Sequence, residues 1–237
     1  MPFLGNSQKV DYNKIIIPEN IRAISFEEKL IQLAWSNNPT NDIAMQNIEM
    51  LAKEKKVARW SWLNDIYGVV NLNEFTINPG SIPDGRSNFF PRYNFGVRLS
   101  LGTFALTPLE TKIANDKLIM GGYEINERKL LMRNQVLSEL ERLKEHYKIM
   151  RIRTRLKEDF LVLYREAEQK FSLGQIAMDQ YRVSSQSYYG RVEAEINALS
   201  VFNQHKIALE GLLGLKLEDI EGYSGFLNQL DMELRID

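Results

Sequence analysis

Residues 136–150 read VLSELERLKEHYKIM, and their apolar side chains recur in alternating steps of four and three. The positions in this series are Val136, Leu140, Leu143, Tyr147 and Met150. Such spacing places them on one side of an α-helix and is typical of a coiled-coil seam. Because no proline follows Pro108, we predict a helix over 108–171, about 64 residues or roughly 96 Å long. A helix of this length is expected to lie in a coiled-coil wall.

The sequence also marks where the long helices start and stop. Thr107 is predicted to cap the long helix, with Pro108 at its first position. Gly174 can take the left-handed conformation that ends a helix. A second long helix is predicted over 177–213, with Gly214 after it. The expected fold class is therefore mainly α, built on long antiparallel coiled-coil helices.

Helices are predicted over 26–62 as well. Ser25 and Glu28 form a capping box at their start, and the Asn-Asn-Pro run at 37–39 interrupts them. After this break the chain carries another heptad seam. Its positions are Ala44, Ile48, Leu51, Lys55, Ala58 and Trp62.

Between these helices the apolar pattern changes to that of a β-strand. Residues 93–101 read YNFGVRLSL and alternate apolar with polar side chains. We predict strands over 65–77 and 93–103, joined by a polar loop rich in Gly and Pro. The apolar face of the second strand is expected to meet lipid and comprises Phe95, Val97, Leu99 and Leu101. The opposite face is expected to line a pore and includes Asn94, Arg98 and Ser100.

The alternation alone leaves two explanations of the strand pair open. It fits a half-buried strand in a soluble sheet, and it fits a strand pair of an outer-membrane barrel. Aromatic residues favour the barrel, because they cluster near both ends of the strands as interfacial girdles do. One cluster contains Trp60, Trp62 and Phe104, and the other Phe75, Phe89, Phe90 and Tyr93. We therefore expect a two-stranded β-hairpin that contributes to an oligomeric β-barrel.

Composition and motifs argue against several classes of function. The 30 basic and 31 acidic residues nearly cancel, so no global field favours nucleic acid. The basic run over 148–157 is flanked by acidic residues and is interpreted as an exposed coiled-coil face. The chain has no cysteine and no phosphate-loop pattern. His146 and His205 are expected on solvated helix faces. We therefore predict no enzyme, no cofactor or metal site, and no nucleic-acid partner.

Several segments, in their order along the chain, resemble the TolC-type outer-membrane efflux family. They are residues 27–34 with 37–39, then 171–174, 187–194 and 208–214. The resemblance covers about residues 25–217, interpreted as a single repeat. An N-terminal arm over 1–24 precedes it, and a C-terminal tail over 218–237 follows.

The resemblance implies a barrel in the outer membrane, continued by a helical tunnel through the periplasm and used for passive export. Chains of this family carry two such repeats and form trimers. Because this chain carries one, a homo-hexamer is the simplest assembly that restores a closed barrel. The expected docking surface for a periplasmic adaptor, driven by an inner-membrane pump, is the turn at Leu173, Gly174, Gln175 and Ile176. Asp179, beside this turn, is expected to line the pore.

Two alternatives stay open at this point. Heptad seams equally serve a structural tube or filament without transport activity. Residues 1–9 lack the basic and apolar regions of a signal peptide. A cytoplasmic or extracellular tube is therefore the alternative to an outer-membrane protein with a periplasmic extension.

Overall fold

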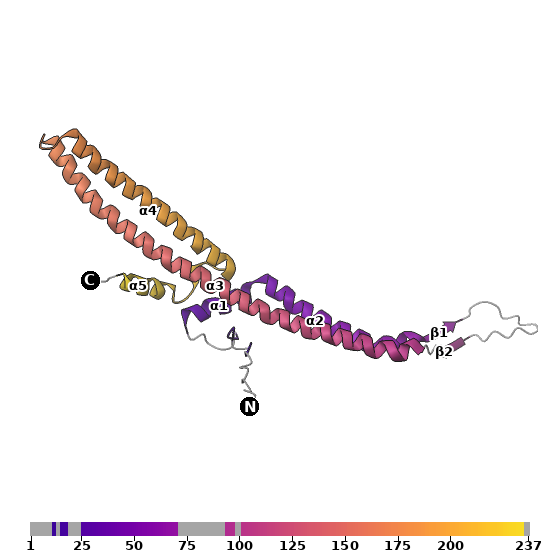
Figure 1. Cartoon of the computed structure of the whole chain (residues 1–237). Helices are drawn as coiled ribbons and strands as arrows, with labels where there is room; N and C mark the ends of the chain where they lie inside the picture. Colours follow the sequence, from indigo (N-terminus) through magenta and orange to yellow (C-terminus); the bar gives the residue numbers. More distant parts are fainter. Residues whose placement is uncertain (1–10, 13–14, 19–24, 71–92, 98–100, 235–237) are drawn as a thin grey trace, which may run out of the picture. The chain divides into compact units, whose positions relative to one another are not determined.

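The computed structural model describes residues 11–12, 15–18, 25–70, 93–97 and 101–234 (Figure 1). This part of the chain is mainly α-helical, as predicted, and its longest helices are α3 and α4. The helices are α1 (Phe26–Asn37), α2 (Pro39–Trp60), α3 (Leu101–Ser172), α4 (Met178–Leu213) and α5 (Tyr223–Glu233). Two short 3-10 helices, η1 (Ser61–Asp65) and η3 (Leu217–Asp219), and two strands, β1 (Ile66–Val70) and β2 (Tyr93–Val97), complete the set.

The strands β1 and β2 pair antiparallel, with Ile66 opposite Val97 and Val70 opposite Tyr93. Within this register Tyr67 lies across from Gly96, and the Tyr67 ring occupies the space that a Cβ at Gly96 would need. The predicted loop and residues 71–77 of the first predicted strand lie outside the described residues.

The predicted boundary between the second strand and the long helix is wrong. The structure ends β2 at Val97 and begins α3 at Leu101, so Leu101 is helical and Pro108 lies inside the helix. A proline in a helix removes one backbone hydrogen bond, and contacts with η1 hold the turns before it. The Thr103 hydroxyl donates to the Asp65 carboxylate. Thr107 does not cap the helix, and its hydroxyl lies 3.4 Å from the Ser61 hydroxyl.

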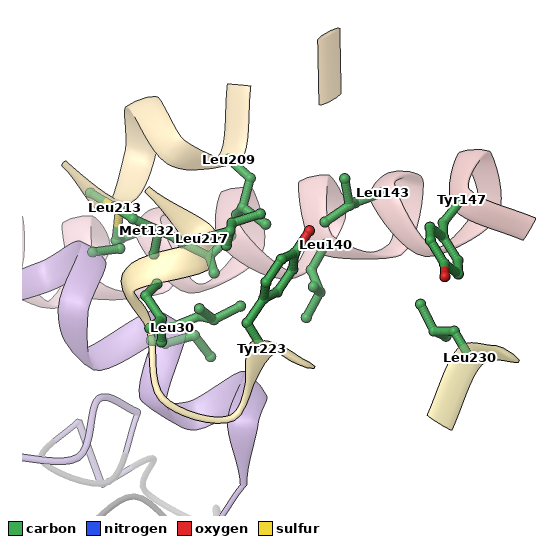
Figure 2. Close-up of a cluster of buried hydrophobic side chains, with 14 of the residues drawn as sticks. Leu30, Met132, Leu140, Leu143, Tyr147, Leu209, Leu213, Leu217, Tyr223 and Leu230 are labelled. Atoms are coloured by element: carbon green, nitrogen blue, oxygen red, sulfur yellow. The ribbon is translucent and has the colours of Figure 1, made fainter. Parts of the chain in front are cut away.

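The chain forms two compact units, one of residues 1–43 with 126–237 and the other of residues 44–125. The first unit holds a continuous hydrophobic core (Figure 2). The predicted heptad seam supplies Val136, Leu140 and Leu143, each no more than 1% exposed. Leu30 and Ile31 of α1 and Leu209 and Leu213 of α4 pack against this seam. Burial of this kind, at about 25 cal/mol per Å² of apolar surface, is what holds the unit together.

The C-terminal tail is part of this core, which the sequence did not predict. Ile220, Tyr223 and Leu230 of the tail are buried in the same cluster, next to Leu217. The Phe226 ring stacks on Phe26 of α1 at 4.9 Å between centroids. The acidic groups of the tail bind the basic run of α3. Asp231 lies 2.9 Å from Arg151, and Glu233 lies 2.6 Å from Lys148.

The second unit contains the rest of α2, the start of α3 and the two strands. The heptad seam predicted on α2 faces α3. A Cβ at Gly121 of α3 would lie 2.8 Å from Leu51 and 3.6 Å from Ile48. One turn away, Lys55 donates to Asn115 at 2.8 Å. The glycine at 121 therefore permits close approach of the two helices.

Candidate functional site

The turn between α3 and α4 is built as predicted. Gly174 has a φ of 70°, in the left-handed region that favours glycine. Its N–H donates to Phe171, and the N–H of Gln175 donates to Lys170, both at 2.9 Å. These are the bonds that close a helix end. Of the four residues predicted to dock an adaptor, Leu173, Gly174 and Gln175 are exposed and Ile176 is half-buried.

Aromatic side chains stiffen the two helices behind this turn. Tyr164 stacks on Tyr188 at 5.2 Å, and Phe171 stacks on Tyr181 at 5.0 Å. The hydroxyls of Tyr164 and Tyr181 lie 3.2 Å apart, and this hydrogen bond raises the pKa of Tyr164. The cluster crosses from α3 to α4, so it fixes how the last turns of one helix lie against the first turns of the other.

The predicted pore-lining and lipid-facing residues are only partly described. Arg98, Leu99 and Ser100 lie outside the described residues. Asn94, Phe95 and Val97 lie on β2, where Asn94 pairs with Val69 and Phe95 with Gly68. Leu101 lies in α3 instead of a strand. Asp179, in the first turn of α4, is exposed and binds Arg182 at 3.1 Å.

Helices α2 and α3 expose large apolar side chains within residues 44–60 and 101–125. Between the two helices lie Ile48 and Leu51, the small Ala114, and the polar bonds Lys55–Asn115 and Ser61–Thr107. Other large apolar side chains face outward. On α3 they are 49–67% exposed and comprise Leu106, Leu109, Ile113, Met120 and Tyr123. On α2 they are 51–71% exposed and include Met50, Val57 and Trp60.

These side chains follow a second heptad series on each helix. We call Gln46, Met50, Lys53, Val57 and Trp60 the α2 seam. We call Leu106, Leu109, Ile113, Asp116, Met120 and Tyr123 the α3 seam. Neither seam is predicted in the sequence analysis, although both follow alternating steps of three and four residues. The α3 seam begins at Leu106, ahead of Pro108, whereas the helix is predicted in the sequence analysis to start at Pro108.

An open groove of about 510 Å³ runs between α2 and α3 along this surface. Met50 and Val57 line it from α2, and Ile113 and Ala114 from α3. Charged side chains of both signs also line it, namely Lys53, Glu54, Glu110 and Lys117, together with Ala58 and Ser61. The groove is apolar with a charged margin, which is the character of a helix-docking surface.

The prediction that both histidines lie on solvated helix faces is wrong. The rings of His146 and His205 stack at 4.8 Å between α3 and α4. His205 Nδ1 lies 3.0 Å from Glu139 Oε2, and the same carboxylate binds Arg142 at 2.9 Å. Helix packing brings Glu139 and His205 together from positions 66 residues apart in sequence, and local spacing does not reveal this contact. Among the described residues, no group of three or more His, Asp or Glu side chains is placed to hold a metal ion.

Comparison of the chain with protein-family models, with curated proteins and with solved structures gives no match. None of the helices in the described ranges combines the length and the apolar character needed to cross a membrane.

Proposed function

We propose that this chain is a protomer of a homo-oligomeric tube that serves as an export channel. The exposed apolar surface of α2 and α3 carries the proposal, because large side chains such as Val57, Trp60 and Met120 are 56–71% exposed. A helix pair that works alone in water buries its apolar stripe. Contiguous exposed apolar surface marks an interaction site. Further copies of the same chain would cover it in a closed assembly.

The helix pair of α3 and α4 supports the same proposal. On α4, residues at helical spacing expose an apolar stripe to solvent, namely Tyr189, Ile196, Leu199 and Ile207. These residues lie away from the buried positions Phe202 and Leu209, which face α3 and the core. A helix with apolar residues on two faces fits a wall in which it has a neighbour on each side.

The channel part of the proposal rests on the order of elements and on the resemblance to TolC-type efflux proteins. In this proposal six copies of the β1–β2 pair close a barrel in the outer membrane, because every backbone group must be paired there. Asn94, Arg98 and Ser100 line the lumen, while Phe95, Val97 and Leu99 meet lipid. The turn at Leu173 and Gly174 receives a periplasmic adaptor coupled to an inner-membrane pump, and Asp179 lies beside that end of the pore.

Extraction and strand substitutions test this proposal. The protein should require detergent and migrate as an oligomer that heating dissociates. Val97→Asp should abolish membrane assembly, because a carboxylate in lipid is costly. Asn94→Asp is the matched control on the opposite strand face and should assemble normally. A freely soluble monomer, or equal behaviour of the two variants, contradicts the channel.

A structural tube or filament is the second candidate. The exposed seams on α2 and α3 favour it, because they lie on helices and would associate without lipid. This assembly should pellet from detergent-free buffer and appear as long tubes by negative-stain microscopy. Short closed particles that form only with detergent or lipid would favour the channel.

A further inference from the structure

We infer that one face of α1 and α3 is a binding site for a short, non-helical peptide segment, and that neighbouring copies exchange their N-terminal arms through it. The docked segment is residues 15–18 of the arm. The inference rests on the proposed oligomeric tube, because the tube brings the arm of a second copy to the site.

The docked segment lies on the core of its unit without belonging to a helix or a strand. Ile16 is 6% exposed and is a member of the hydrophobic cluster, and Ile15 packs against that cluster. Ile17 is half-buried and Pro18 is exposed. One buried side chain therefore anchors the segment, and the residues on either side of it lie nearer the surface.

Two side chains of the helices bind the main chain of this segment. Arg133 Nη1 of α3 donates to the carbonyl oxygen of Ile15 at 2.8 Å, and Gln32 Nε2 of α1 donates to that of Pro18 at 2.7 Å. In peptide recognition, main-chain hydrogen bonds supply affinity and a pocket for a side chain supplies selectivity. The site therefore fits a segment that carries a large apolar residue between two free carbonyl groups.

Helix α1 holds Arg133 ready for this role. The Arg133 guanidinium also donates to both carboxylate oxygens of Glu28, with Nη1 3.0 Å from Oε2. Glu28 lies in the first turn of α1, where its N–H donates to Ser25 Oγ at 3.2 Å. A planar guanidinium bound at two points keeps its other donors in a fixed direction. The donor to Ile15 is therefore in place whichever chain supplies the segment.

The contacts of the docked segment are the same for the arm of any copy. They involve two carbonyl oxygens and the side chain of Ile16. Within the ranges described, residues 15–18 make no backbone–backbone hydrogen bond that would tie them to the rest of their own chain. Exchange of an identical segment between copies replaces each contact by an equal one, which makes it a low-cost way to link them.

The length of the chain beside the site permits this exchange. From Pro18 to Ser25, the cap of α1, the chain spans at most about 25 Å when extended. Two helices packed side by side occupy about 20 Å. In the proposed tube each copy adds the width of two helices, so the arm of one copy is long enough to dock on the next.

Cross-linking between differently tagged copies tests the exchange, because the chain contains no cysteine. One copy carries Pro18→Cys and the other carries Gln32→Cys, and a short bismaleimide is added to the mixed oligomer. Exchange should give a product that contains both tags. Asn203→Cys in place of Gln32→Cys is the matched control and should give none, because Asn203 is exposed on α4 and the site lies on α1 and α3. Pro18→Cys with Gln32→Cys in one chain should react and shows that docking brings the two positions together.

A labelled peptide of residues 11–18 tests the site apart from oligomerisation, with binding measured by fluorescence anisotropy. Ile16→Asp in the full chain should release the chain's own arm, because a carboxylate in the core is costly. This variant should bind the peptide about tenfold or more tightly than the wild-type chain does, since the tethered arm of the wild type competes at high local concentration. The Ile16→Asp peptide should bind the same variant about tenfold or more weakly than the unchanged peptide.

The outcomes separate the site, the exchange and the tube. Oligomers that give no product with both tags overturn the exchange and leave the tube standing. Equal binding of the two peptides, or binding of neither, overturns the site. A wild-type chain that stays monomeric in detergent and in buffer overturns the tube and the exchange, while the peptide measurement still decides the site. Because the cross-linking variants keep Ile16, they test the exchange even where Ile16→Asp lowers stability.

Discussion

Asn37 Nδ2 donates a 2.9 Å hydrogen bond to the carbonyl oxygen of Leu213. This bond joins the end of α1 to the end of α4, across 176 positions of sequence. Gly214 follows with a φ of 68°, and a Cβ there would lie 3.3 Å from Asn37 Cβ. The Asn-Asn-Pro run and the Leu-Gly ending, which both entered the family resemblance, therefore meet in one contact. The last carbonyls of a helix need such partners.

We expect Asn37→Ala to lower the free energy of unfolding of residues 1–43 with 126–237 by about 1–2 kcal/mol, because it leaves a helix-end carbonyl without its donor. Chemical denaturation followed by circular dichroism measures this. Asn203→Ala is the control, since Asn203 is exposed on α4. A loss as large in the control would mean that the Asn37 contact is not specific.

Leu140→Ala should destabilise the same unit by about 2–5 kcal/mol, because a fully buried leucine leaves a cavity when it is truncated. Leu131→Ala on the same helix is the matched control, because Leu131 is 52% exposed. Its effect should stay below about 1 kcal/mol in an isolated protomer. If both substitutions cost the same, the heptad seam at 136–147 is not the core of the unit.

The adjacent glycines of α3 should respond differently to a large side chain. Gly121→Ile should separate α2 from α3, because Leu51 and Ile48 occupy the space beside Gly121. Gly122→Ile should be tolerated, because no atom outside the helix lies within 4 Å of a Cβ there. Hydrogen exchange of residues 44–60 should rise about tenfold or more in the first variant. Equal exchange in both variants would contradict the close approach at Gly121.

The contact between Lys157 and Glu195 makes the pairing of α3 with α4 sensitive to acid. Lys157 donates to Glu195 at 2.9 Å, and this bond lowers the pKa of Glu195 below its ordinary 4.5. A carboxyl group with a lowered pKa stabilises the folded state above its ordinary pKa. That stabilisation is lost as the pH falls from 4.5 through the lowered value.

Glu195→Gln should therefore lower the free energy of unfolding by about 0.5 kcal/mol at neutral pH. It should also make the free energy of unfolding decrease less as the pH falls below 4.5. Urea unfolding across a pH series measures both effects. Glu193→Gln is the control on the same helix, because Glu193 is exposed and has no ion pair in the ranges described. An unchanged acid slope in Glu195→Gln would contradict the stabilising role of the pair.

The sequence by itself determined the features that depend on local backbone preference and on the spacing of apolar residues. These include the long helix through Val136 and Leu140, the turn at Gly174 and the end of α4 at Gly214. A steady apolar repeat without proline specifies a helix, and a glycine with positive φ ends one, whatever lies nearby.

Only the tertiary structure decided which faces meet. It begins α3 at Leu101, ahead of Pro108, because η1 supplies partners for Thr103 and Thr107. It also stacks His146 on His205 and leaves the α2 and α3 seams exposed. Each of these outcomes depends on contacts between segments distant in sequence, and a one-dimensional pattern does not record which of two heptad series faces its neighbour.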